Sequence, residues 1–172
     1  MEPIHPKIVH LPIALSMILP LLGGILTLAW WRGWLPRRVL LIVMILHGAL
    51  TISTFVAMQT GETDERTAKN EVSIDLIRAH ESSAELFLWS TVGALFLALI
   101  ATVAEKEQEA LRFAIGTVLF ALLSLYLAID VGHQGGQLVY KHGAARAFMN
   151  TQSDQSPSSK PPSSEAKTIN IR

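Results

Sequence analysis

The sequence predicts an all-α integral membrane protein, built as a four-helix up-down-up-down bundle with a disordered polar C-terminal tail. Three observations predict it. Half of the 172 residues are hydrophobic, and the mean hydropathy is +0.37. The apolar residues fall into four long blocks, whereas a soluble domain distributes them more evenly. The last residues, from about 149 to 172, are dominated by Ser, Pro, Lys and Gln.

The first apolar block runs from Ile8 to Trp31 without a charged residue. At 1.5 Å per residue, about 24 residues cross a hydrocarbon core of about 30 Å. The chain opens with Met-Glu-Pro instead of the basic segment of a secretory signal, so we expect an uncleaved helix. Aromatic and basic residues typical of a membrane boundary lie at the end of the block and just after it, namely Trp30, Trp31, Trp34, Arg32, Arg37 and Arg38.

The other blocks complete a four-span membrane domain over residues 1–148, followed by a disordered tail at 149–172. The predicted spans are residues 8–31, 39–59, 84–104 and 111–131. Residues 60–83 carry many charges, so we expect them outside the bilayer, in part as a surface helix. The short connection after the first span holds three arginines and no acid, which favours a cytoplasmic location for it. Both termini would then lie outside the cell.

Composition excludes several classes of function. The chain has no cysteine, which rules out disulfides, thiolate-bound zinc or iron–sulfur centres and covalently attached c-type haem. The net charge is zero and no basic helix occurs, so we expect no nucleic-acid binding. No hydrolase elbow, HExxH helix or dinucleotide fingerprint is present. We therefore expect an electron-transfer or binding protein more than a stand-alone enzyme.

Five of the six histidines belong to one membrane face, because an even number of crossings returns the chain to its starting side. They are His5, His10, His80, His133 and His142. Imidazoles from different helices can bind haem iron axially. We predict a b-type haem with axial ligands from His10, His80 and His133, and with His5 or His142 at the entrance.

Two alternatives use the same face. A divalent metal ion could be bound by His10, His80, His133 and Asp130, because Asp130 and His133 are spaced i, i+3 on one helix face. The histidines could also form a capping network without any cofactor. Gly132, Gly135 and Gly136 are expected to stop the fourth helix and to turn the chain back over the bundle mouth, making His142 a lid residue.

His47 stands apart from this cluster, near the middle of the second span. An ionisable residue at that depth is costly. The favoured interpretation is helix packing through a hydrogen bond to a neighbouring helix, and proton transfer is the alternative. A transporter is less favoured, since no pair of broken helices from repeated halves is evident.

Two motifs give the chain a family resemblance. The segments 5–15 (HPKIVHLPIAL) and 132–143 (GHQGGQLVYKHG), with Thr60-Gly61 and Ala79-His80, resemble the bacterial membrane family called domain of unknown function 2231. The resemblance covers roughly residues 3–143. It implies a small multi-span protein with a histidine-rich face, and family members adjoin c-type cytochrome or Rieske-like modules in some chains.

Taken together, the residues and the resemblance predict an electron-transfer subunit of the bacterial inner membrane. We expect it to bind haem b and to exchange electrons with a quinone, a c-type cytochrome or a Rieske-like protein. The alternative is a metal-binding or structural and assembly subunit without haem.

Overall fold

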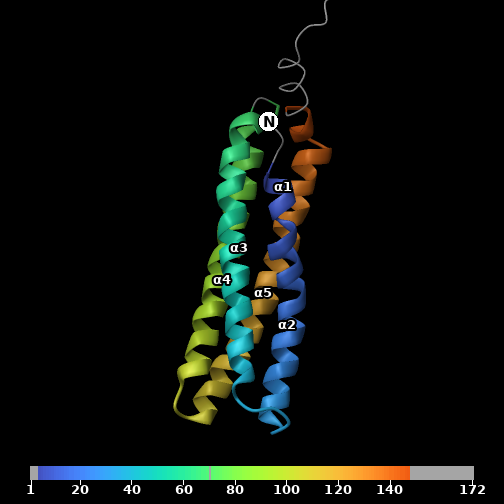
Figure 1. The fold of residues 1–172 in the computed structure, drawn as a ribbon. Coiled ribbons are helices and arrows are strands. Elements are labelled where there is room, and N and C mark those ends of the chain that lie inside the picture. Colours follow the sequence, from blue (N-terminus) through green and yellow to red (C-terminus); the bar gives the residue numbers. More distant parts are fainter. Residues whose placement is uncertain (1–3, 70, 148–172) are drawn as a thin grey trace, which may run out of the picture.

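The protein is a bundle of four long helices with one short helix at its N-terminal end (Figure 1). The computed structural model describes residues 4–69 and 71–147, and no strand occurs among them. The elements are α1 (His5–Ile8), α2 (His10–Trp31), α3 (Val39–Ala68), α4 (Ile74–Val103) and α5 (Glu107–Tyr140). The predicted all-α class is confirmed.

Each long helix packs against two others, so the bundle is a closed square. α2 contacts α3 and α5, and α4 contacts the same two helices. α2 therefore lies diagonal to α4, and α3 diagonal to α5. All four are long and apolar enough to cross a membrane. Their outward faces carry large apolar side chains that belong against lipid, including Leu21, Ile45, Phe96 and Leu119.

The two ends of the bundle differ in chemistry. We call the end that holds α1, the α3–α4 connection and the C-terminal part of α5 the histidine end. The opposite end holds the α2–α3 connection at residues 32–38 and the α4–α5 connection at 104–106, and we call it the arginine end. The up-down-up-down order thus confirms the expectation that four crossings return the chain to the end of the bundle at which it started.

Proline shapes the first span. α1 ends at Ile8 and α2 begins at His10, with Val9 between them still in a helical conformation. Pro12 has no N–H to donate to the carbonyl of Ile8, which weakens the helix at that turn. Pro20 lies inside α2 without ending it.

The charged segment 60–83 is more helical than expected. α3 continues to Ala68 and α4 already begins at Ile74, so only residues 69–73 connect them. An i, i+4 ion pair of 2.7 Å between Glu65 and Lys69 supports the last turn of α3. At about 1.5 Å per residue, helices of this size exceed a hydrocarbon core of about 30 Å, so their ends project from it.

The expectation that the glycines at 132–136 end the fourth helix is wrong. α5 runs unbroken to Tyr140 because its backbone bonds continue across the glycines. The turn comes at Gly143, whose φ is +78°, and Ala144 then packs against Val72 and Ile77. The proposed tail, residues 149–172, lies outside the described residues.

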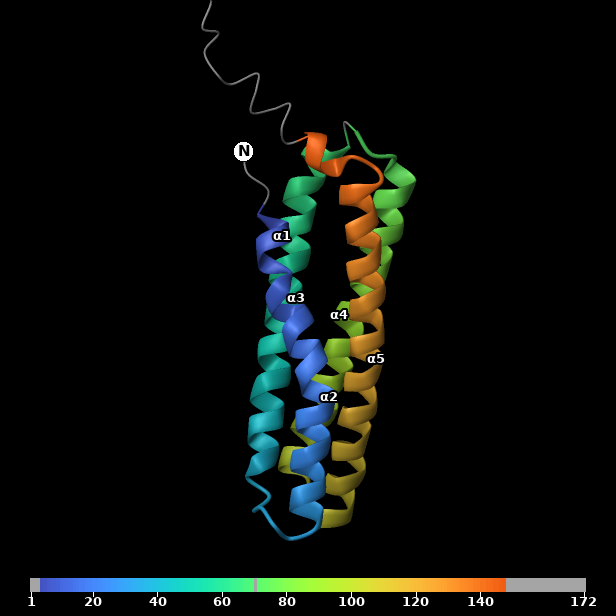
Figure 2. The same cartoon turned by 90° about the vertical axis from the view of Figure 1, so that its right-hand side faces the viewer.

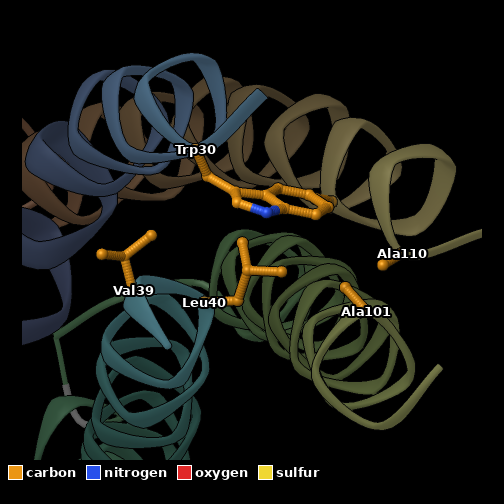
Figure 3. Close-up of a cluster of buried hydrophobic side chains, with 6 residues drawn as sticks. Trp30, Val39, Leu40, Ala101 and Ala110 are labelled. Atoms are coloured by element: carbon orange, nitrogen blue, oxygen red, sulfur yellow. The ribbon is translucent and has the colours of Figure 1, made fainter. Parts of the chain in front are cut away.

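Two apolar layers cross the bundle interior. The histidine-side layer consists of Leu19, Leu50, Phe87 and Ala128. The arginine-side layer consists of Trp30, Val39, Leu40, Ala101, Ala110 and Ala114 (Figure 3). In the close-up the indole of Trp30 lies over Leu40 in the middle of the bundle. Every long helix contributes to both layers, which makes each of them a complete apolar cross-section.

Candidate functional site

Two histidines meet at the histidine end of the bundle. The ring centres of His5 and His80 lie 6.3 Å apart, and the ring planes are inclined by 83°. Both side chains are partly buried. His5 belongs to α1, which packs on α3, and His80 belongs to α4, which packs most closely on α5. The ribbons of these two helix pairs stand apart at this end (Figure 2), and the two imidazoles come from opposite sides of that gap.

His5 is held from both its backbone and its ring. The carboxylate of Asp64 on α3 accepts the backbone N–H groups of Ile4 and His5 at 2.9 and 3.0 Å, which caps the start of α1. The ring Nδ1 donates to the carbonyl oxygen of Ala57 at 2.8 Å. Because this bond fixes the proton on Nδ1, the Nε2 lone pair of His5 is free to bind an electrophile.

Each imidazole lies against one glycine of another helix: the His5 ring lies against α3, and the His80 ring lies against α5. A Cβ at Gly61 of α3 would lie 3.3 Å from Cε1 and Nδ1 of His5. A Cβ at Gly135 of α5 would lie 3.2 Å from Cε1 of His80. These distances are too short for an ordinary side chain contact. Glycine therefore lets α3 and α5 approach the two rings closely.

The surroundings of His80 contain buried polar atoms without partners. Nδ1 of His80 is buried and makes no hydrogen bond. Nearby on α5, the amide nitrogen of Gln134 donates to Ser83 and to Asp130, both at 2.8 Å, while its Oε1 is buried and unpartnered. Unsatisfied buried polar atoms are uncommon and point to a missing hydrogen-bond or ligand partner.

The other predicted ligands are placed differently. His10, His133 and His142 expose their side chains, and the Gln137 amide lies 2.6 Å from Nε2 of His133. Asp130 bonds Gln134. Within residues 4–69 and 71–147, no three His, Asp or Glu side chains are grouped so that they could hold a metal ion. The roles of His10, His133, His142 and Asp130 as ligands stay predictions.

Sequence reasoning alone assigned His5 to the entrance and did not single out Asp64 as a cap or Gly135 as a contact of His80. The sequence holds little signal for such a cap, because an Asp that caps a distant helix has no fixed sequence spacing from it. His47 also differs from expectation. Its Nδ1 donates to Val43 of its own helix at 2.8 Å, not to a neighbouring helix.

The residues of this site coincide with the motif positions that carry the family resemblance. A family described as predicted membrane protein, DUF2231, matches residues 1–147. The chain belongs to this family. No curated protein and no solved structure matches the chain. For this DUF2231 member, the motif residues His5, Gly61, His80 and Gly135 come from four different helices and meet at one end of the bundle.

Proposed function

We propose that this DUF2231 protein is a membrane electron-transfer subunit, in which His5 and His80 bind the iron of a b-type haem at the histidine end. The observation that carries the proposal is the close approach of two imidazoles from diagonal sides of the bundle, with ring centres 6.3 Å apart and ring planes inclined by 83°. The ligands proposed here therefore differ from the His10, His80 and His133 predicted from the sequence. Only His80 belongs to both sets.

The spacing of the pair would allow both imidazoles to bind one iron ion. A metal ion lies about 2 Å from an imidazole nitrogen, and the ring centre lies roughly 1 Å further, so two opposed ligands have centres about 6 Å apart. The separation of 6.3 Å between His5 and His80 agrees with this value. The Nδ1 bond of His5 to a backbone carbonyl is the usual support of a ligating histidine.

The number of ligands favours haem over a bare metal ion. A structural or catalytic divalent ion takes three or four protein ligands, and no such group occurs among the described residues. Haem iron needs only axial ligands from the protein, because the porphyrin supplies the others. A pair of imidazoles therefore suits haem better than it suits a divalent metal ion.

The chain's own residues would position this group and set its surroundings. Asp64 and the carbonyl of Ala57 hold His5 in place, and Gly61 and Gly135 leave the backbone of α3 and α5 beside the rings. The group itself would supply reversible one-electron chemistry. The partly buried position of both imidazoles limits access of water and favours a stable ligand geometry.

The site's position suits exchange at a membrane surface. We place the protein in the bacterial inner membrane with the arginine end in the cytoplasm and the histidine end outside, since three arginines and no acid lie in the α2–α3 connection. A c-type cytochrome or a Rieske-like protein could then reach the histidine end from solution, and a quinone from the bilayer.

The visible absorption spectrum of the full chain, purified from membranes, tests this function. We expect a Soret band and resolved bands on reduction with dithionite. His5→Ala and His80→Ala should each abolish the low-spin spectrum, because one axial ligand is lost. His10→Ala and His133→Ala are matched controls at exposed histidines and should retain it.

Two results would contradict the proposal. A wild-type protein that stays colourless after expression with ample haem supply excludes haem binding and leaves the structural or assembly role. A haem spectrum that survives in both His5→Ala and His80→Ala excludes this ligand pair. Metal analysis of the same samples distinguishes haem iron from a bare divalent ion.

A further inference from the structure

A polar compartment lies in the middle of the bundle, between the two apolar layers. On each long helix, the buried positions between the histidine-side and arginine-side layers hold small or polar residues, apart from Pro20 and Val43. The polar members of this central compartment are Thr27, His47, Ser90, Thr91, Thr117 and Ser124. Two of them, Ser90 and Ser124, join α4 to α5 through a hydrogen bond of 2.8 Å.

His47 is the one titratable residue among the buried polar side chains that the structure describes. Its side chain is 1 % exposed. Because Nδ1 donates to the carbonyl of Val43, Nε2 carries a lone pair, and this buried atom has no hydrogen-bond donor. No buried Asp, Glu, Lys or Arg from α2, α4 or α5 faces the compartment within the described residues.

The compartment offers room and partners for water. A cavity of about 10 Å³ lies where the compartment meets the arginine-side layer, and it is lined by Thr27 and Thr117 together with the apolar residues Leu40, Val43, Ala98, Ala101 and Ala114. His47 does not line this cavity, but it lies one helical turn from Val43, which does. The size of the cavity is close to the minimum of about 10 Å³ that a single water requires.

We propose that this central compartment holds water and binds a proton at Nε2 of His47, enclosed on both sides by the apolar layers. The proton arrives as hydronium, forms an N–H bond with the Nε2 lone pair and leaves a water molecule behind. Release reverses these steps. The site is separate from the His5–His80 pair, and its function does not depend on haem.

Proton flux through liposomes that contain the full chain tests the compartment. The variant Leu40→Ser/Leu50→Ser makes both layers polar, and we expect it to dissipate a pH gradient several-fold faster than wild type. Adding His47→Leu should return the flux to the wild-type level. Leu41→Ser/Ile52→Ser is the matched control, because both residues lie exposed on the lipid-facing side of the same helix.

Two flux results would overturn the proposal. The first is that Leu40→Ser/Leu50→Ser conducts protons no faster than wild type. The second is that the variant carrying His47→Leu in addition conducts protons as fast as Leu40→Ser/Leu50→Ser. A measurement on the wild type decides the case if the layer variants fail to assemble. In bilayers, ¹⁵N NMR should show cross-peaks from water to the His47 ring, assigned by their absence in His47→Asn. A ring without water contact also overturns the proposal.

Discussion

Gly135 and Gly136 are neighbours in α5, yet a side chain has very different consequences at the two positions. A Cβ at Gly135 would lie 3.2 Å from the His80 ring, whereas a Cβ at Gly136 would meet nothing within 4 Å. The contrast provides a matched pair of variants that share their helix and their chemistry. It separates the contact with His80 from the general preference of helices for alanine over glycine.

We expect Gly136→Ala to stabilise the protein by about 0.5–1 kcal/mol, because alanine loses less backbone entropy in a helix. Gly135→Ala gains the same contribution but must displace the His80 ring, at a cost of about 1–3 kcal/mol. Thermal unfolding in detergent measures both. Equal melting temperatures for the two variants would show that His80 does not pack on Gly135.

At the residue scale, the sequence predicted the end of the bundle at which the histidines lie better than it predicted their contacts. Counting crossings places His5 and His80 at the same end of the bundle, and the structure confirms this. Which histidines face inward depends on the rotation of each helix about its axis, and terminal positions have little apolar periodicity to define it. His10 is therefore exposed although it is only five residues from His5.

At the level of elements, Arg37 joins the α2–α3 connection to the end of α4. Its guanidinium donates to the carbonyl oxygens of Ala101 and Thr102 at 3.0 and 3.3 Å, and also to that of Ala104. These carbonyls lie at or beside the C-terminus of α4 and have no further helical N–H to bind. The sequence predicted a lipid-boundary anchor here, and the structure adds a helix cap.

Arg37→Ala should lower the free energy of unfolding by about 2 kcal/mol, because charge-assisted bonds to helix-end carbonyls are lost. Arg37→Lys should recover only part of it, since an ammonium cannot reproduce the planar fork of donors. Arg38→Ala is the control at an exposed neighbour. Equal unfolding curves for Arg37→Ala and Arg38→Ala would contradict the capping role.

The boundaries of the elements were predictable only where the chain is apolar. Hydropathy identifies the membrane-crossing parts but says nothing about helix that continues into water, so α3 and α4 are longer at the histidine end than the predicted spans. The end of α5 was predicted too early, at its glycines, for a related reason. Glycine permits a helix to end, but packing against neighbouring helices can hold it in the helix.

At the scale of the whole molecule, one topology determines both proposed sites. The antiparallel order brings His5 and His80 to one end, and it also aligns the two apolar layers on all four long helices. The sequence predicted this order from four apolar blocks. It did not predict the polar compartment between the layers, because His47 and the hydroxyls that accompany it are far apart in sequence and come together only on packing.

The side of the membrane on which each connection lies tests this topology most directly. The chain has no cysteine, so single substitutions can be labelled with a membrane-impermeant maleimide in sealed vesicles. We predict that Lys7→Cys, Asp75→Cys and Lys141→Cys react from one side, and that Gly33→Cys and Glu107→Cys react only from the other. Labelling of Lys7→Cys and Asp75→Cys from opposite sides would contradict the account.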